Sequence, residues 1–313
     1  MSENHTALGI LVGCTATGKT AVANEIARQT GSWVLSADSM LVYRGMDIGT
    51  AKPTPGELAG VTIFGLDLAN PDEAFSVGAW LEHARTAFAT AEKSGAEMIV
   101  AGGTGLYVNA LLNGIDAPPA DPEQRARLTE ELERNGPEVL RLRAERLSPG
   151  STAQLEQGNN RRLIRLLECL ESSFVPLRKY VTRKMQPIVG LSFDREALQH
   201  RIEHRARIMF EQGLADEVAR LRSSYPGFEA STAGKGIGYA EALAVLDGTM
   251  TQAQAIERTI VRTRQLAKRQ NTWWRHQLNV EWIPGPADAS EVPVVAAKVL
   301  AFWRNHERTH LSF

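Results

Sequence analysis

The first third of the chain alternates short apolar runs with segments of helical periodicity. Apolar runs at residues 7–13, 33–38 and 97–103 have the length of buried strands. Between them, residues 19–29 and 76–95 place apolar side chains three or four positions apart, which is typical of amphipathic helices. Strands that alternate with helices predict a parallel sheet that is covered by helices on both faces.

This alternation stops at residues 113–122, where Pro and Gly become frequent, and we expect a hinge or domain boundary there. The sequence that follows is helical, is rich in Arg and Glu, and has no strand pattern before residues 186–194. We therefore predict a helical insertion within an α/β core. The expected segments are a first core part, the insertion and a second core part: residues 1–117, 118–186 and 187–313.

The second core part reads mostly as helices. After Asp194 several helices are expected, and the last of this series is long and covers residues 252–276. Residues 280–284 add one short strand before a C-terminal helix.

The long helix carries a concentration of positive charge. Residues 258–275 contain six Lys or Arg residues and no Asp or Glu. At ~100° per residue, the basic side chains fall on two stripes with apolar residues between them. One helix can therefore pack into the core and still present charge to a phosphate backbone, although a solvated basic face would have the same pattern. Trp273 and Trp274 read as core residues rather than as base-stacking platforms.

The composition is ordinary for a soluble globular protein, since 43% of the 313 residues are hydrophobic and 23% are charged. The two cysteines, Cys14 and Cys169, cannot form a disulfide framework, which fits a reducing cytosol. No apolar run approaches the ~20 residues of a membrane span, and residues 1–6 are polar rather than signal-like. We expect a cytoplasmic monomer with no membrane partner.

The net charge of −1 by itself argues against a nucleic-acid partner, but the charge is unevenly distributed. Residues 1–120 carry 6 Lys and Arg against 12 Asp and Glu, a balance of −6. Residues 121–313 carry 29 against 24, a balance of +5. A basic region on an otherwise acidic protein points weakly to a polyanionic partner.

Residues 13–20 fit a phosphate-binding loop, with an apolar run directly before them and a helix pattern directly after. Gly13 and Gly18 let the backbone turn its N–H groups inward, and the helix N-terminus adds favourable partial charge. Lys19 supplies a positive charge to the distal phosphate, and the Thr20 hydroxyl is placed to ligate Mg²⁺. The pattern predicts a phosphate site without distinguishing ATP from other phosphates. The loop residues are Gly13, Cys14, Thr15, Ala16, Thr17, Gly18, Lys19 and Thr20.

A motor protein or GTPase needs a second acid at the end of a buried strand to hold the Mg²⁺ water shell. Here the third apolar run is followed by Thr104 and no carboxylate, whereas Asp38 follows the second run. Residues just past the carboxyl ends of parallel strands line the ligand crevice, so Asp38 and Thr104 are expected to face the bound phosphates. This pair suits a base that grips a substrate better than a hydrolytic motor. Alternatively, Asp38 caps a turn and Thr104 caps the helix that follows.

Six blocks in a fixed order carry a family resemblance. The first, SADSMLVYRGMDIGTAKP at residues 36–53, closely resembles the signature of bacterial tRNA dimethylallyltransferases. Five more blocks are similar to the same family: AGGTGLYVNALLNG, RRLIRLLE, GLADEVARL, GIGYAEAL and TRQLAKRQNTWWRH. The resemblance covers nearly the whole chain. It implies an α/β fold, with a P-loop NTPase-like parallel sheet flanked by helices and an all-helical insertion domain.

The resemblance implies a cargo other than ATP. In this family the loop binds the diphosphate of dimethylallyl diphosphate, and the dimethylallyl group moves to the exocyclic amine of the adenine 3′-adjacent to the anticodon of tRNA. Asp38 would be the general base at that amine, and Thr104 would help to position it. Lys19, the loop amides, Thr20 with Mg²⁺ and an arginine from the later helices would stabilise the pyrophosphate leaving group.

The resemblance also implies a set of tRNA contacts. The insertion and the basic helix would clamp the anticodon stem-loop, whose target base must leave its stack to reach a buried carboxylate. The implied contact residues are Asp38, Ser39, Met40, Leu41, Thr104, Arg125, Arg161, Arg162, Leu163, Ile164, Arg165, Arg262, Arg264, Lys268 and Arg269.

Four positions depart from the family pattern. Cys14 replaces a usual proline, and Leu41 stands where Gln is common. Residues 63–65 replace a usual His-His pair, and Ala240 replaces a basic residue. The last two departures suggest an altered tRNA preference.

Three other functions fit parts of the pattern. An isopentenyltransferase that acts on free adenine nucleotides would not need the insertion or the basic helix. An ATP-dependent small-molecule kinase would use Asp38 to activate a hydroxyl. A non-enzymatic RNA-binding protein with a vestigial loop is disfavoured because Lys19, Thr20 and Asp38 are all intact.

Overall fold

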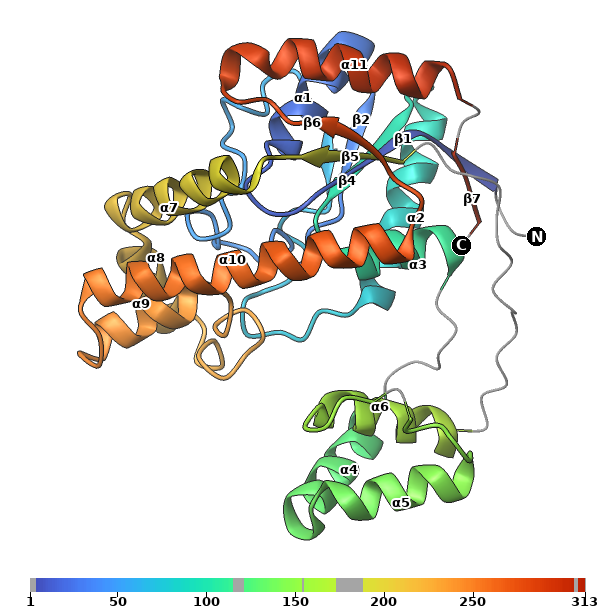
Figure 1. Ribbon diagram of the computed structural model, residues 1–313, viewed down its shortest axis with the longest axis vertical. Coiled ribbons are helices and arrows are strands. Elements are labelled where there is room, and N and C mark those ends of the chain that lie inside the picture. Colours follow the sequence, from blue (N-terminus) through green and yellow to red (C-terminus); the bar gives the residue numbers. More distant parts are fainter. Residues whose placement is uncertain (1–3, 115–120, 154, 173–187, 307–308, 313) are drawn as a thin grey trace. The chain divides into compact units, whose positions relative to one another are not determined.

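The computed structural model describes residues 4–114, 121–153, 155–172, 188–306 and 309–312 (Figure 1). The chain divides into two compact units, of which the first comprises Met1–Gly114 with Arg183–Phe313 and the second comprises Ile115–Thr182. The domain boundaries expected at 117/118 and 186/187 lie outside the described residues. Among the described residues, no helix combines the length and apolar character that a membrane span requires.

A seven-stranded sheet forms the centre of the first unit. Six strands pair in parallel in the order β3-β2-β4-β1-β5-β6, and β7 pairs antiparallel with the first residues of β1. The strands are β1 Asn4–Val12, β2 Trp33–Ser36, β3 Ile63–Phe64, β4 Met98–Gly102, β5 Ile188–Ser192, β6 Glu281–Pro284 and β7 Thr309–Ser312. The parallel sheet expected from the apolar runs is confirmed.

Two strands, β3 and β7, were not expected from the sequence pattern. β3 is only two residues long, and its pairing with β2 defines it. Where the sequence departs from the resembled family at residues 63–65, Phe64 packs beside Trp33 and the Gly65 N–H donates to Nε2 of His83 at 3.1 Å. A strand as short as β3 depends on tertiary pairing, because two residues are too few to show the alternation of a strand.

Helices cover both faces of the sheet (Figure 1). Along β4, Met98 and Val100 pack toward α2 and α3, whereas Ile99 packs toward α1 and α11. This alternation follows from the two-residue period of a strand. The helices of this unit are α1 Lys19–Thr30, α2 Val77–Lys93, α3 Gly105–Asn113, α7 Arg195–Glu211, α8 Leu214–Ser224, α9 Tyr239–Leu246, α10 Gln252–Gln277, the short η1 Ala289–Glu291, and α11 Val292–Arg304.

The helix ends follow local signals in the sequence. Gly31 ends α1 in the left-handed region with φ of 72°, and its N–H donates to Ala27 O. Ser76 begins α2, and its hydroxyl oxygen accepts the Ala79 N–H at 3.1 Å. Because side-chain caps and left-handed glycines satisfy the end groups locally, the helices expected at 19–29, 76–95 and 252–276 are confirmed within a few residues.

The tryptophans of α10 belong to the core, as expected. Trp274 is fully buried, and Trp273 is partly buried and stands edge-on to it. The Trp273 ring lies so close to Gly105 that a Cβ on that glycine would come within 2.4 Å of it. This contact anchors the start of α3, and with it Thr104, against the basic helix.

The second unit is helical throughout its described secondary structure, which confirms the expected character of the insertion. It consists of α4 Pro122–Asn135, α5 Pro137–Leu147 and α6 Asn160–Glu171. A small apolar core holds them together, with Leu128, Leu140 and Leu163 all fully buried.

Candidate active site

A cleft of about 1180 Å³ lies in the first unit where the parallel strands end. Its walls include residues that follow β1, β2 and β4, which is where ligands bind in open α/β sheets. Residues 15–20, Asp38 and Thr104 line the cleft together with side chains from α7, α9 and α10. The sequence expectation that the loop, Asp38 and Thr104 lie in one site therefore agrees with the geometry.

The phosphate-binding loop has the backbone that its glycines predict. Gly18 is left-handed with φ of 76° and begins α1, and Ala16 also has a positive φ, of 66°. The Lys19 ammonium donates to Cys14 O at 2.6 Å, so the lysine lies back over its own loop. Thr20 is exposed at the start of α1 and lines the cleft.

Cys14, the unusual residue of the loop, is a core residue. Its side chain is buried and packs with Ile202 and Ala206 of α7 and with Ile260 and Ala267 of α10. Burial raises the pKa of the thiol. A small apolar side chain is therefore what this position requires, and it ties the loop to two helices.

Two cations, Lys19 and Arg205, lie at the phosphate-binding loop. Burial lowers the pKa of Lys19 to about 8, while Cys14 and Asp38 partly oppose this and Arg205 adds to it. Burial likewise lowers the pKa of the Arg205 guanidinium, and Asp38 again opposes the shift. Partly desolvated positive groups that lie near each other favour a bound polyanion. Its negative charge offsets both the loss of hydration and the repulsion between the two cations.

Pyrophosphate affinity should fall as pH rises through about 8, because Lys19 loses its proton there and the loop loses a positive charge. A bound anion raises the lysine pKa again, so affinity should decline rather than vanish. Titration calorimetry with pyrophosphate across this range measures the effect. The matched variant Lys19→Arg keeps its charge, and its affinity should stay level over the same pH range. An equal decline in that variant would rule out Lys19 as the titrating group.

Asp38 and Thr104 are held by a short network between two neighbouring loops. Asp38 Oδ1 accepts the Met40 N–H at 2.9 Å. Thr104 Oγ1 accepts the Ser39 N–H at 2.9 Å, and its backbone N–H donates to Ala37 O at 3.0 Å. Asp38 does cap its own turn, whereas the Thr104 hydroxyl bonds to the neighbouring loop rather than to the start of α3.

Three side chains of the site were not named from the sequence, although an unspecified arginine from the later helices was expected at the leaving group. Arg205 donates to Thr50 O at 2.9 Å and to the Thr15 hydroxyl at 3.4 Å, and Arg201 donates to Ala16 O at 2.8 Å. Both arginines come from α7, which begins soon after β5, so their four-residue spacing on one helix face was the available signal.

Gln270 of α10 is the third, and it joins two loops. Its Oε1 accepts the Thr15 N–H and its Nε2 donates to Gly103 O, each at 2.9 Å. The amide therefore bridges the phosphate-binding loop and the turn that carries Thr104. Gln270 is one of five glutamines in this helix, and nothing in the sequence distinguishes it for such a role.

The expected tRNA-contacting residues of this unit divide into two groups. Ser39 and Met40 are half-buried and line the cleft, and Leu41 lines it although its side chain is 8% exposed. On α10, Arg262 forms an ion pair with Glu241 at 2.6 Å, and Arg264 pairs with Glu203.

The remaining two basic residues of that set, Lys268 and Arg269, are exposed. Within the described part of the chain neither forms an ion pair. They are therefore the members of the set whose charge is most available to a partner.

The expected tRNA-contacting residues of the second unit also differ in exposure. Leu163 and Ile164 are buried in its core, while Arg161 and Arg162 are exposed. The other two arginines, Arg125 and Arg165, both form ion pairs with Glu168.

Glu168 is 1% exposed and accepts from two arginines. Arg125 binds it through two bonds of 2.7 and 2.9 Å, and Arg165 binds it at 2.7 Å. The Arg125 side chain is 50% exposed and that of Arg165 is 32% exposed. Their bonds to the shared acid restrain both guanidiniums.

Within the described residues, no group of three or more His, Cys, Asp and Glu side chains is arranged to hold a metal ion. Mg²⁺ commonly needs only one or two protein oxygens when substrate phosphates and water complete its shell. The Thr20 hydroxyl at the mouth of the loop fits that requirement.

Comparison with known sequences gives a consistent picture. A family model described as IPP transferase matches residues 41–277, and a second described as isopentenyl transferase matches residues 6–73. The chain is 40% identical over 280 residues to a tRNA dimethylallyltransferase of Kocuria rhizophila. The aligned region covers 87% of this chain and 88% of that protein. The chain is also 37% identical to one of Acidothermus cellulolyticus, with 94% and 93% covered.

Solved structures are similar as well. A full-length tRNA isopentenylpyrophosphate transferase from Bacillus halodurans has a TM-score of 0.69 and 32% identity, with 96% of this chain and 97% of that chain covered. A eukaryotic dimethylallyltransferase acting on tRNA has a TM-score of 0.76, with 94% and 77% covered, and at 22% identity this likeness shows the fold alone. The expected P-loop NTPase-like α/β fold is confirmed. Because identity of about 40% extends over most of its length, this chain belongs to the tRNA dimethylallyltransferase family.

Proposed function

We propose that this protein transfers a dimethylallyl group from dimethylallyl diphosphate to the exocyclic amine of the adenine 3′-adjacent to the anticodon in tRNA, with release of pyrophosphate. The observation that carries the proposal is one cleft that has cations on one side and a carboxylate on the other. The loop with Lys19 and Arg205 suits a diphosphate, and Asp38 with Thr104 suits a polar nucleophile. Family membership supports the same reaction.

The positive side of the cleft acts on the leaving group. As the bond between the allylic carbon and its oxygen breaks, the electron pair passes to the pyrophosphate, whose charge rises. Lys19, Arg205 and the loop N–H groups are in place beforehand, and preorganised charge of this kind is usually the largest catalytic term. The Thr20 hydroxyl would hold Mg²⁺, which when bound would supply further positive charge to the leaving group.

The negative side of the cleft acts on the nucleophile. The adenine nitrogen forms the new bond to carbon and loses one proton, which the Asp38 carboxylate accepts. The Met40 N–H donates to Oδ1 and restrains the carboxylate. Thr104 Oγ1 accepts the Ser39 N–H and so restrains the backbone next to Asp38.

Positive charge outside the cleft supports a tRNA substrate rather than a free nucleotide. We propose that Lys268 and Arg269 on α10, with Arg161 and Arg162 on α6, contact tRNA phosphates because they are exposed. Arg125 and Arg165 are fixed by Glu168 and would add contacts of defined geometry. Because residues of one chain line the cleft, we propose that the protein acts as a monomer. We also propose that it is cytoplasmic.

Replacing Lys268 and Arg269 together by Ala should weaken tRNA binding and flatten its dependence on salt. Each lost phosphate contact removes about 0.7 to 0.9 from the slope of log affinity against log salt concentration, so the pair should remove about 1.5. Filter binding at several salt concentrations measures the slope. The control pair Lys298→Ala and Arg304→Ala lies on α11, at exposed positions, and should leave the slope unchanged. An unchanged slope in the α10 pair would contradict the proposed contact.

A labelled transfer assay tests the function itself. The protein is incubated with Mg²⁺ and labelled dimethylallyl diphosphate, together with unmodified tRNA or with AMP, and the label is followed. Transfer to tRNA only is expected, on the adenine next to the anticodon. Transfer to AMP alone would show the nucleotide-specific enzyme instead, and phosphate transfer from ATP would show a kinase.

A further inference from the structure

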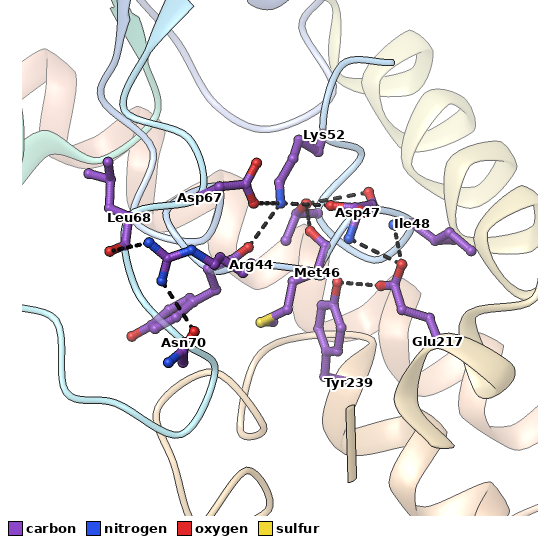
Figure 2. A network of polar contacts seen from close by, with 12 residues as sticks. Arg44, Met46, Asp47, Ile48, Lys52, Asp67, Leu68, Asn70, Glu217 and Tyr239 are labelled. Carbon is purple, nitrogen blue, oxygen red and sulfur yellow. Dashed lines mark hydrogen bonds and ion pairs between the residues drawn. The ribbon is translucent and has the colours of Figure 1, made fainter. Parts of the chain in front are cut away.

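A buried carboxylate lies behind the cleft, outside the residues that the reaction uses directly. Glu217 of α8 is 3% exposed, and its partners among the described residues are neutral hydrogen-bond donors (Figure 2). Its Oε2 accepts the N–H groups of Asp47 at 3.1 Å and Ile48 at 2.8 Å, and its Oε1 accepts the Gly49 N–H at 3.3 Å. The Tyr239 hydroxyl donates to Oε1 at 2.7 Å.

These bonds organise one loop that has no regular secondary structure. Three consecutive backbone N–H groups converge on one carboxylate, and the Tyr239 ring closes over Gly49 so tightly that a Cβ there would come within 2.5 Å. On the other side of the loop, Lys52 binds Asp47 and Asp67 at 2.7 Å each (Figure 2). The loop is therefore held from both sides.

The loop leads directly to the diphosphate side of the cleft. Thr50 follows the three bonded N–H groups, and its carbonyl oxygen accepts the Arg205 guanidinium at 2.9 Å. Gly49 and Thr50 also line the cleft. The position of the Thr50 carbonyl thus decides where one arm of Arg205 is held.

We propose that Glu217, assisted by Tyr239, is a positioning residue that sets the Thr50 carbonyl and through it aims Arg205 at the bound diphosphate. The inference rests on the proposed function of the cleft. It also gives a role to two family-like blocks, GLADEVARL and GIGYAEAL, which contain these two residues and lie far from Asp38 in the sequence.

A carboxylate suits this position better than an amide. Glu217 accepts four hydrogen bonds through two oxygens, whereas a glutamine has one oxygen and would turn its own N–H groups toward other donors. Burial and Glu217 together raise the pKa of Tyr239, so its hydroxyl stays a neutral donor. The Glu217→Gln substitution therefore disturbs the loop while changing few atoms.

A double-mutant cycle tests the proposal. Glu217→Gln should weaken pyrophosphate binding and lower kcat/KM for dimethylallyl diphosphate about tenfold, because a buried hydrogen-bond network is broken. The dissociation constant for tRNA should stay within about twofold. In an Arg205→Lys background, adding Glu217→Gln should cost little more, because residues that act through one element are not additive. Fully additive losses would overturn the proposal.

Further variants separate positioning from stability. Asp216→Asn changes an exposed neighbouring carboxylate on the same helix and should behave like the wild type. Tyr239→Phe removes one bond to Glu217, so it should give a smaller loss of pyrophosphate affinity than Glu217→Gln. If Glu217→Gln does not fold, Tyr239→Phe takes its place in the cycle with Arg205→Lys, and additivity there overturns the proposal. Pyrophosphate binding is measured without transfer, so a failure of the proposed reaction stays distinguishable.

Discussion

Asp38→Ala should lower the turnover number by about 100- to 10,000-fold, which is the range for loss of a general base. The proton of the adenine amine would then lack the carboxylate that we propose accepts it. Binding of tRNA should be nearly unchanged, because Asp38 carries no positive charge toward the phosphate backbone. Single-turnover kinetics with saturating substrates measure the chemical step apart from product release.

Asp38→Asn separates the charge of this residue from its shape. Its side-chain oxygen can still accept the Met40 N–H, as Asp38 Oδ1 does at 2.9 Å, so the loop should keep its conformation. Turnover should nevertheless fall as far as in Asp38→Ala, since an amide cannot take up the proton. Near-normal turnover in either variant would refute Asp38 as the base.

Arg205→Ala should lower turnover by about 100- to 1,000-fold, the usual loss when one preorganised donor to a developing charge is removed. The pKa of Lys19 shows whether this loss comes from the missing charge of Arg205 or from a general disturbance of the site. Arg205 contributes to the depression of the Lys19 pKa to about 8, so its removal should raise that pKa. Pyrophosphate affinity should then begin to fall at a higher pH than in the wild type.

A neighbouring arginine on the same helix provides the control for Arg205. Arg207 is exposed and pairs with Glu257 at 3.5 Å, and neither residue is among those that line the cleft. Arg207→Ala should leave turnover and the pH dependence within about twofold of the wild type, as for other surface substitutions. Equal losses at both positions would mean that α7 needs arginine for folding and that the leaving-group role is wrong.

Much of the core architecture could be predicted because its signals are local. The phosphate-binding loop, the caps at Ser76 and Gly31, and the buried runs of the central strands each lie within a few consecutive residues. Asp38 and Thr104 followed from one topological rule, since the carboxyl ends of parallel strands meet at one edge of the sheet.

The site residues that were missed come from far along the chain. Arg205 reaches the loop from 190 positions away, and Gln270 from 255. Periodicity shows that these residues lie on helices, but it does not show which helix face meets the loop. The same limit applies to the basic residues of α10, where only the fold shows that Arg262 is paired with Glu241 while Lys268 is exposed.

The amino-acid sequence alone determined the parallel α/β core, the helical insertion, the phosphate-binding loop and the family resemblance, because each depends on short-range patterns or ordered motifs. The tertiary structure decided which distant side chains surround the phosphate-binding loop. It placed Cys14 in a core between two helices and brought Arg205 to the loop, and it enclosed Glu217 among backbone donors. Packing between distant segments sets such contacts, since burial and hydrogen-bond partners depend on which faces meet once the chain has folded.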